Sequence, residues 1–341
     1  MFNQLISMHI GILGDGGWGT ALAILLAKKG YSVGLWGVFP EYLEILERKR
    51  ENIKFLPGKK IPSSVRIIKD KEKIINTSSI IVVAIPSKYL RSTLQEFSHF
   101  DFRNKIILSV VKGIEEDTYL RPSEIIDRAL GMVNSAVLSG PSIAQEVAGG
   151  IPTAVVIASS DLELAKKLQE IFSTENFRVY TSSDVIGVEL GGALKNIIAL
   201  ACGISDGLGF GTNTKAALLN RGLVEMIRLG TCLGARPETF WGLSGLGDLI
   251  TTCFSPYSRN RGVGEEIGKG RKLKEIIKRM EMVAEGILTT RAVYELAKRR
   301  NIEMPITEQV YRVIYEDKSP KKAVKELMTR ELKEEVVSRN P

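Results

Sequence analysis

Histidine is scarce in this sequence of 341 residues, and that restricts its chemistry. The only two histidines, His9 and His99, have no other histidine or cysteine nearby at metal-ligand spacing. A catalytic triad or a histidine acid–base pair would have to use one of these two poorly placed residues. We therefore expect no metal site. If the chain is an enzyme, we expect its proton donor among the lysines, carboxylates or tyrosines.

Cysteines and long apolar runs are also few. Cys202, Cys232 and Cys253 form no CxxC pair and leave one cysteine over, which indicates a reducing compartment. No apolar run reaches the ~18 residues needed to span a membrane. The N-terminal MFNQLIS lacks the basic region and cleavage site of a secretory signal. We expect a cytoplasmic protein without membrane insertion.

The formal net charge is +8, but the basic residues are spread along the chain. They accompany no aromatic-rich RNA motif and no zinc-finger spacing, so we expect no nucleic-acid partner. A solvated basic surface and a site for an anionic ligand both remain open explanations of the charge.

The N-terminal half alternates between apolar strand-like segments and helical segments. Strands are predicted at 8–13, 32–36, 79–85, 105–111, 135–139, 153–158 and 177–181. Helices are predicted at 17–29, 40–49, 87–97, 122–130 and 162–172. This alternation predicts an α/β fold, with a doubly wound, Rossmann-type, mostly parallel sheet covered by helices on both faces.

After about residue 184 helical periodicity takes over. Helices are predicted at 185–206, 214–234, 272–280, 287–299 and 306–316, with a glycine-rich connection at 242–264 between them. We expect a dinucleotide-binding domain over 8–184 and an all-helical substrate domain over 185–335. The first helix of the second domain would lie at the boundary, where ligand pockets often form.

The segment HIGILGDGGWGTALA places the pattern G-x-G-x-x-G between a strand and a helix. Gly14 permits a tight turn, Gly16 lets the backbone approach a pyrophosphate, and Gly19 lets the helix pack on the strand. The N-terminus of the helix would face the phosphates. The segment predicts an NAD or NADP site, and the alternative is a tight turn without a ligand.

Polar residues follow three other predicted strands, at the sheet edge where such folds bind ligands. Ser87, after Pro86, can cap the next helix. Lys112 follows the next strand and is either exposed or functional. Ser142, two residues after Gly140, is expected to cap a short helix whose N-terminus could bind an anion.

The helix VIGVELGGALKNIIALACG carries a single lysine, Lys195, on a face of small residues. Gly191, Gly192 and Ala199 would let another backbone or a ligand come close. Burial there would lower the pKa of Lys195, which suits proton donation to a substrate carbonyl as hydride arrives. The alternative is a lysine that extends from a thin face to solvent.

The glycine-rich connection concentrates residues that suit a phosphate, because arginine offers a planar fork of donors and serine and asparagine add neutral ones. A flexible surface loop is the alternative. The residues are Asp248, Thr251, Thr252, Ser258, Arg259, Asn260 and Arg261.

Several motifs together closely resemble bacterial NAD(P)-dependent glycerol-3-phosphate dehydrogenases over nearly the whole chain. They are GDGGWGTALA, VKGIE, SGPSIAQEV, ELGGALKNIIALACGISDGLGFGTNTKAALLNRG, GLSGLGDLITTC, SRNRGVG, VAEG and LMTRELKEE. The resemblance implies reduction of dihydroxyacetone phosphate to sn-glycerol 3-phosphate by NADH or NADPH, for phospholipid synthesis. It also implies a cytosolic homodimer without a metal.

The resemblance implies a role for each matching position. Lys195 looks like the proton-transferring lysine, Lys112 like a second lysine that contacts substrate and cofactor, and Asp248 like a residue that orients the site. The implied substrate-binding residues are Lys112, Gly140, Ser142, Lys195, Asn196, Asp248, Thr252, Ser258, Arg259 and Asn260. The cofactor contacts expected from the glycine loop and the resemblance are Gly14, Gly16, Gly17, Trp18, Gly19, Val38, Pro86, Lys112, Ala144, Arg259, Val283 and Glu285.

Two other functions remain open. One is a related helical-domain dehydrogenase acting on a hydroxy acid of the 3-hydroxyisobutyrate or 6-phosphogluconate type. The other is a non-catalytic protein that senses the cofactor, which would need neither the two lysines nor a phosphate site.

The choice of cofactor depends on the end of the second predicted strand. A NAD-specific site usually carries Asp or Glu there, ~20 residues after the glycine loop. The residues here are Trp36, Gly37 and Val38, and Glu41 belongs to the first turn of the next helix. Gly37 would leave room for a 2′-phosphate, so the sequence predicts that both cofactors serve and that NADPH is preferred.

Overall fold

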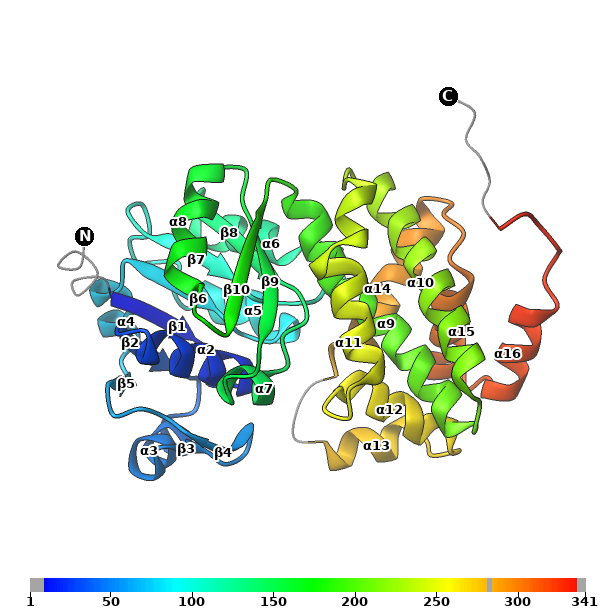
Figure 1. The fold of residues 1–341 in the computed structure, drawn as a ribbon, viewed down its shortest axis with the longest axis horizontal. Helices are drawn as coiled ribbons and strands as arrows, with labels where there is room; N and C mark the ends of the chain where they lie inside the picture. Colours follow the sequence, from blue (N-terminus) through cyan, green and yellow to red (C-terminus); the bar gives the residue numbers. More distant parts are fainter. Residues whose placement is uncertain (1–8, 281–283, 336–341) are drawn as a thin grey trace.

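The computed structural model describes residues 9–280 and 284–335, and its first part is built on one twisted sheet (Figure 1). The sheet has eight strands in the order β10-β9-β8-β7-β6-β1-β2-β5. Every neighbouring pair is parallel except β8 and β9, so the predicted mostly parallel sheet is confirmed. The strands are β1 (His9–Leu13), β2 (Ser32–Trp36), β5 (Val65–Ile67), β6 (Ile80–Val83), β7 (Ile106–Ser109), β8 (Asn134–Ser139), β9 (Thr153–Ala158) and β10 (Phe177–Ser182).

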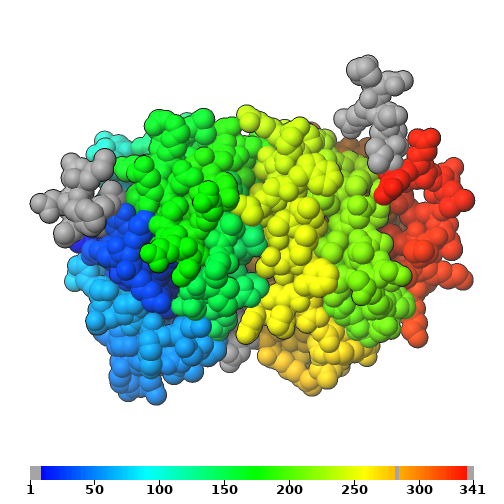
Figure 2. All heavy atoms as spheres, viewed as in Figure 1, coloured from blue at the N-terminus to red at the C-terminus, as the bar shows by residue number. Residues whose placement is uncertain are grey.

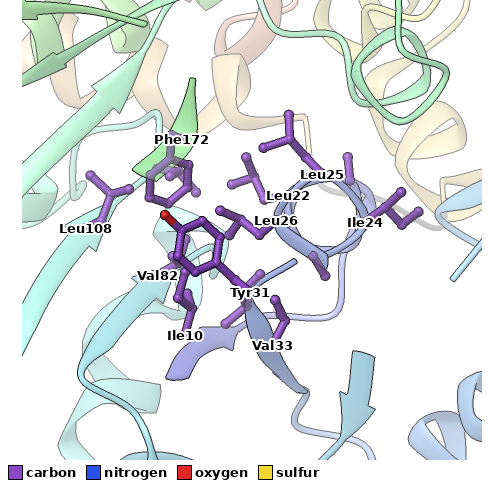
Figure 3. Packing of buried hydrophobic residues seen from close by; sticks show 14 of the residues in the cluster. Ile10, Leu22, Ile24, Leu25, Leu26, Tyr31, Val33, Val82, Leu108 and Phe172 are labelled. Carbon is purple, nitrogen blue, oxygen red and sulfur yellow. The ribbon is translucent and has the colours of Figure 1, made fainter. Parts of the chain in front are cut away.

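Helices cover both faces of this sheet. Alternate residues of β1 enter different cores, since Ile10 and Ile12 belong to one buried cluster and Leu13 to another. In Figure 3, Leu22 and Leu26 of α2 point toward Ile10 and Val82 of the sheet. Two buried faces explain why the strands are almost continuously apolar. The helices are α2 (Gly17–Lys28), α3 (Pro40–Lys49), α4 (Lys71–Thr77), α5 (Ser87–Gln95), α6 (Pro122–Leu130), α7 (Ala144–Ala148) and α8 (Leu162–Phe172).

A small hairpin, β3 (Glu51–Asn52) and β4 (Leu56–Lys60), lies beside the glycine loop. Its Asn52 is fully buried, and the Nδ2 group donates to the backbone oxygen of Asp15 and to Thr20 Oγ1, each at 2.7 Å. Sequence periodicity did not predict the hairpin or β5, because such short strands have too few residues to show alternation. The hairpin nevertheless fixes the loop that starts α2.

The second part is helical, and α9 (Val185–Gly207) runs through its centre (Figure 1). Around it lie α10, α11, α12, α14 and α15. In the space-filling view the two parts pack directly against each other (Figure 2). The remaining helices are α10 (Thr212–Cys232), α11 (Asp248–Phe254), α12 (Arg259–Gly268), α13 (Leu273–Arg279), α14 (Glu285–Arg299), α15 (Pro305–Tyr315) and α16 (Pro320–Met328).

The segment 242–264 was expected to be a glycine-rich connection between helices, and this expectation is wrong. Most of the segment is helical. A π-helix at Leu243–Gly247 continues directly into α11, and α12 follows after a short turn. Its glycines serve close packing: a Cβ on Gly245 would lie 2.1 Å from the backbone oxygen of Phe240. The segment therefore presents its polar residues from helix ends.

Helix α9 is the one helix among the described residues that is long and apolar enough to cross a membrane. Most of that apolar window, 83%, is buried inside the protein. Every residue from Gly187 to Ser205 is buried, so Lys195 does not extend to solvent from this helix. The expected close approach of another backbone is confirmed, since a Cβ on Gly191 would lie 2.7 Å from the backbone oxygen of Ser244. The side chains on this face of α9 are small because other parts of the backbone pack against it.

Candidate active site

The glycine loop has the geometry that a pyrophosphate requires. Gly14 has a φ of +123°, and a Cβ there would lie 2.5 Å from the backbone oxygen of Ala84. A Cβ on Gly19 would lie 2.0 Å from the oxygen of Gly14. A Cβ on Gly16 would meet nothing within 4 Å, and no side chain caps the N-terminus of α2. The helix end therefore offers backbone N–H groups beside open space, which fits a dinucleotide phosphate.

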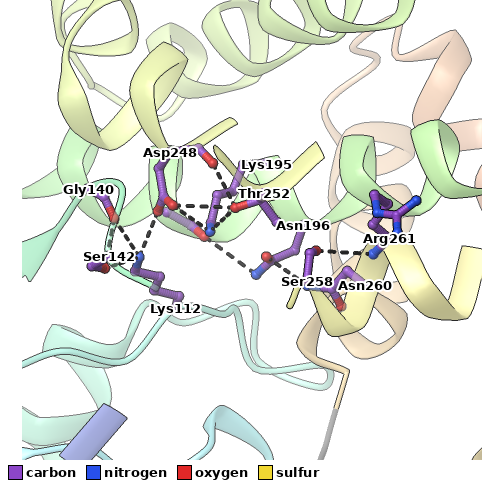
Figure 4. A network of polar contacts seen from close by, with 11 residues as sticks. Lys112, Gly140, Ser142, Lys195, Asn196, Asp248, Thr252, Ser258, Asn260 and Arg261 are labelled. Carbon is purple, nitrogen blue, oxygen red and sulfur yellow. Dashed lines mark hydrogen bonds and ion pairs between the residues drawn. The ribbon is translucent and has the colours of Figure 1, made fainter. Parts of the chain in front are cut away.

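Asp248 joins the two lysines that the sequence singled out (Figure 4). Its Oδ1 accepts from Lys195 Nζ at 2.7 Å, and its Oδ2 accepts from Lys112 Nζ at 2.7 Å. Lys112 also donates to the backbone oxygen of Gly140 at 2.9 Å and to Ser142 Oγ at 3.2 Å. Lys195 also donates to Thr252 Oγ1 at 2.6 Å. The structure thus brings six predicted site residues into one network.

The elements that carry this network meet at one edge of the sheet. Lys112 follows β7 and Gly140 follows β8, so both come from carboxyl ends of parallel strands. Lys195 projects from α9, and Asp248 begins α11. A Cβ on Gly192 would lie 2.5 Å from Ser139 Oγ, so this glycine lets α9 approach the strand ends. The small residues around Lys195 exist for this close packing.

Burial controls the protonation of Lys195, whose side chain is 7% exposed. The pKa of Lys195 is lowered from 10.5 to about 8, chiefly because burial desolvates the ammonium group; the charge of Asp248 opposes this shift and the charge of Lys112 adds to it. An ammonium group with a pKa near neutral pH can give up its proton readily. The expected lowering of this pKa is confirmed.

A second polar group lies one residue along α9. The Nδ2 group of Asn260 donates to Asn196 Oδ1 at 2.8 Å, and Asn260 Oδ1 accepts from the backbone N–H of Gly286 at 2.9 Å. Ser258 caps α12, since its Oγ accepts from the backbone N–H of Arg261 at 3.2 Å. These contacts fix the first turn of α12 against α9 and α14.

Arg259 and Glu285 lie at helix starts close to each other. Arg259 is the first residue of α12, and its side chain is exposed. The surrounding protein desolvates the guanidinium and lowers the pKa of Arg259, while the charge of Glu285 raises it. Glu285 begins α14 and accepts from the backbone N–H of Ser87 at 2.9 Å and from the Ser87 hydroxyl. A contact to the α/β part therefore positions Glu285.

Comparison with known proteins decides the family. Two family models match this chain: the N-terminal part of NAD-dependent glycerol-3-phosphate dehydrogenase over residues 9–165, and its C-terminal part over 184–325. The chain belongs to this family.

Relatives within the family are similar along their whole length. The glycerol-3-phosphate dehydrogenase [NAD(P)+] of Chlorobium phaeobacteroides (strain BS1) is 53% identical over 332 residues, covering 96% of this chain and 99% of that one. That of Citrifermentans bemidjiense is 50% identical over 331 residues, with 96% and 99% covered. The crystal structure of glycerol-3-phosphate dehydrogenase from Coxiella burnetii superposes with a TM-score of 0.92 at 40% identity, covering 95% of this chain and 99% of that one.

Some predicted positions in this glycerol-3-phosphate dehydrogenase family member lie differently from what the sequence suggested. Ser87 and Ser142 do not cap helices, because α5 starts at Ser87 itself and α7 starts two residues after Ser142. Ser87 instead contacts Glu285, and Ser142 accepts from Lys112. The two serines thus serve the site through their side chains.

The other predicted cofactor positions are scattered around the glycine loop. Ala144 starts α7, and its Cβ lies 3.9 Å from where a Cβ on Gly17 would be. Pro86 precedes α5, and Val38 is 50% exposed after β2. Val283 lies outside the described residues. Contacts of all these residues with a cofactor stay predictions.

A hollow of about 470 Å³ opens elsewhere, at the start of α9. It contains none of the predicted site residues, and no lysine or arginine lines it, so it lacks the charged donors of the predicted phosphate site. It is lined by Ala154, Val156, Tyr180, Ser182, Val188, Thr239, Gly242, Leu243 and Ser244.

The expected free space beside Gly37 is absent. A Cβ on Gly37 would lie 2.3 Å from the carboxyl carbon of Asp15 and 2.5 Å from each of its oxygens. Sequence reasoning missed Asp15 because it treated this position as a variable residue inside the glycine motif. A carboxylate between two glycines of such a loop is the signal that could have found it.

Proposed function

We propose that the chain reduces dihydroxyacetone phosphate to sn-glycerol 3-phosphate with NADH or NADPH, and that the product supplies glycerophospholipid synthesis. The observation that carries this proposal is the pair of lysines bridged by Asp248 at the sheet edge. The names and similarity of the relatives support it. When bound, the nicotinamide cofactor would supply the hydride that reduces C2 of the substrate.

Lys195 is the proton donor. When the carbonyl oxygen at C2 gains negative charge, the Lys195 ammonium protonates it, and the pKa of about 8 suits that transfer. Asp248 and Thr252 hold Nζ in place by hydrogen bonds of 2.7 and 2.6 Å. Lys112 keeps a second positive charge beside the same carboxylate, which stabilises the developing alkoxide.

The phosphate of the substrate binds at the start of α12. Arg259 there presents a charged fork, and the helix N-terminus adds favourable backbone dipoles. Asn260 and Asn196 lie buried between this helix end and Lys195 on α9, so a bound phosphate would fix the distance from C2 to the proton donor. Gly140, Ser142 and Ser258 complete the substrate-binding set.

The two parts of the chain divide the work. Residues 8–184 form the dinucleotide-binding domain, with Gly14, Gly16, Gly17, Trp18 and Gly19 around the phosphates. Residues 185–335 form the substrate domain, which also contributes cofactor contacts through Arg259, Val283 and Glu285. Val38, Pro86, Lys112 and Ala144 are the remaining cofactor contacts.

Both cofactors belong to this proposal. The preference for NADPH predicted from the sequence assumed open space at Gly37, and the carboxyl group of Asp15 fills that space. The ranking of the two cofactors therefore depends on Asp15.

We also propose that the chain acts as a homodimer in the cytoplasm. Its three cysteines are free, as in a reducing compartment. Several large apolar side chains between residues 241 and 257 are exposed and could meet a second copy: Trp241, Ile250, Phe254 and Tyr257. Light scattering on the eluting protein would give twice the chain mass.

The test is a spectrophotometric assay of dihydroxyacetone phosphate with NADH and NADPH in parallel. We expect oxidation of the cofactor with this substrate, and none with the keto forms of 3-hydroxyisobutyrate or 6-phosphogluconate. Activity on those acids alone would favour the hydroxy-acid dehydrogenase. Cofactor binding without turnover of any of them would favour a cofactor-sensing protein.

A further inference from the structure

The end of β2 lacks the acidic residue that Rossmann folds usually place there. That residue accepts a hydrogen bond from the 2′-hydroxyl of the adenosine ribose and disfavours a 2′-phosphate. In this chain Trp36 ends β2, and Gly37 and Val38 follow. No carboxylate of the strand itself can perform this function.

The carboxyl group of Asp15 stands at that place instead. Both of its oxygens lie 2.5 Å from the point where a Cβ on Gly37 would be, so it fills the volume in which a side chain at 37 would begin. Among the described residues, Asp15 Oδ2 has no hydrogen-bond partner although it is shielded from solvent. A shielded carboxylate oxygen without a donor is costly, which suggests that a ligand supplies one.

The surrounding chain holds Asp15 in this position. Its backbone oxygen accepts from Asn52 Nδ2 at 2.7 Å and from Thr20 Oγ1 at 3.4 Å. The backbone N–H of Gly14 donates to the oxygen of Trp36 at 2.9 Å, which ties the glycine loop to the end of β2. The backbone of Asp15 is therefore fixed beside the end of β2 before any ligand arrives.

We infer that Asp15 recognises the adenosine ribose of the cofactor and makes this site select NAD(H) over NADP(H). A 2′-hydroxyl would donate to the free carboxylate oxygen. A 2′-phosphate would bring like charges together in a site with little solvent to screen them. This inference rests on the proposed use of a nicotinamide dinucleotide.

The ionisation of Asp15 is compatible with this role at neutral pH. Burial raises the pKa of Asp15 to about 6, and its own backbone N–H opposes the rise. The group is therefore mostly ionised at pH 7.5 and can only accept hydrogen bonds from a ribose.

Direct binding separates this inference from catalysis. Calorimetry at pH 7.5 would compare adenosine 5′-monophosphate with adenosine 2′,5′-bisphosphate, and NADH with NADPH. We expect the wild type to bind the members without a 2′-phosphate more tightly. In Asp15→Asn and Asp15→Ala, the ratio of dissociation constants should shift by at least about tenfold toward the 2′-phosphorylated member, the size of one lost charge contact.

Asp101→Asn is the matched control, because Asp101 is an exposed carboxylate whose contacts are to its own neighbour Arg103. It should leave the ratio unchanged. An unchanged ratio in both Asp15 variants, or tighter wild-type binding of the 2′-phosphorylated members, would overturn the role of Asp15 while leaving the proposed reaction intact. If the wild type binds neither dinucleotide, the proposed function fails together with this inference.

Discussion

Asp248 is one carboxylate shared by two ammonium groups, and this has an electrostatic consequence. Each carboxylate oxygen of Asp248 lies 2.7 Å from the Nζ atom of one lysine. Two ammonium groups and one carboxylate together carry a net positive charge. Asp248 is 2% exposed, so water screens that charge poorly. A substrate oxygen that becomes negative during reduction would find an unbalanced positive charge already oriented toward it.

Lys195→Ala should abolish most turnover, because it removes the group that we propose protonates the substrate oxygen. General acid catalysis typically contributes ~10²–10⁴-fold, so we expect kcat to decrease by a factor in that range. Cofactor affinity, measured by fluorescence titration of the same preparation, should stay nearly constant and serves as the control. If more than about a tenth of wild-type turnover remains, Lys195 is not the acid.

The pH dependence should follow the same residue. Lys195 donates a proton only below its pKa, which burial lowers to about 8. The value of kcat/KM for reduction should therefore fall as the pH rises through about 8. Oxidation of glycerol 3-phosphate needs the neutral amine and should rise over the same interval. A reduction profile that stays flat between pH 7 and 9 would contradict the assignment.

Sequence reasoning found individual site residues more readily than their contacts. Lys195 stood out because it is the single lysine on a helix face of mostly small residues. Its bond to Asp248 spans 53 residues, and no local pattern carries that information. Asp15 was missed for a related reason. Its carboxyl group lies beside Gly37, which is 22 residues away in the sequence and follows a different strand, so no local pattern links the two residues.

At the scale of elements, α9 and α12 touch backbone to backbone. A Cβ on Gly203 of α9 would lie 2.0 Å from the backbone oxygen of Arg261, and a Cβ on Gly264 of α12 would lie 2.2 Å from that of Leu200. Since Arg259 and Asn260 lie on the first turn of α12, this contact sets their distance from Lys195. The glycines that suggested a loop are thus what lets two helices approach.

Gly203→Ala should push α12 away from α9. We expect a loss of about 1–3 kcal/mol in the free energy of unfolding, as for other overpacked cores. The KM for dihydroxyacetone phosphate should also rise, because the proposed phosphate-binding residues move with α12. Thermal denaturation and steady-state kinetics would measure the two effects.

Gly262→Ala is the control for this prediction. Gly262 lies in α12, the helix that Gly203 of α9 contacts, and a Cβ on Gly262 would meet nothing within 4 Å. Replacing it should leave the KM unchanged and stabilise the protein by up to about 1 kcal/mol. Equal destabilisation by both substitutions would show that backbone contact between the helices is not the cause.

Elements of ordinary length were predictable, and very short ones were not. The predicted strand at 153–158 and helix at 162–172 match β9 and α8 residue for residue, because both carry a clear apolar pattern. The antiparallel pairing of β9 with β8 was not predictable, because the direction of a strand depends on the path of the connection before it and not on the strand's own residues. The hairpin at 51–60 was not predicted, because its strands are too short to show alternation of apolar and polar residues.

At the scale of the whole molecule, two carboxylates join the helical part to the α/β part, and one of them, Glu189, is buried while Glu285 is half-buried. Glu285 accepts from Ser87, and Glu189 of α9 accepts from Arg121 at 2.6 Å and from the Ser123 hydroxyl at 2.7 Å. Both are glutamates whose pKa is raised by burial and lowered again by these partners. Separation of the two parts would expose these groups together.

Arg121→Met should destabilise the protein by about 3–5 kcal/mol, because it leaves the buried Glu189 without its cation. The loss should grow as the pH rises, since the unpaired carboxyl then holds a proton in the folded state that it gives up on unfolding. Denaturant unfolding at several pH values would measure this. Arg103→Met, which breaks an exposed pair with Asp101, should leave the unfolding midpoint unchanged.

The buried amide of Asn52 has a consequence for motions of the cofactor site. It ties the hairpin to the carbonyl of Asp15, and a Cβ on Gly17 would lie 2.5 Å from the oxygen of Phe55 in the same hairpin. The hairpin and the glycine loop should therefore open together as one cooperative unit. Cofactor binding should slow deuterium exchange of the amides at 51–60, even though none of them is expected to touch the ligand.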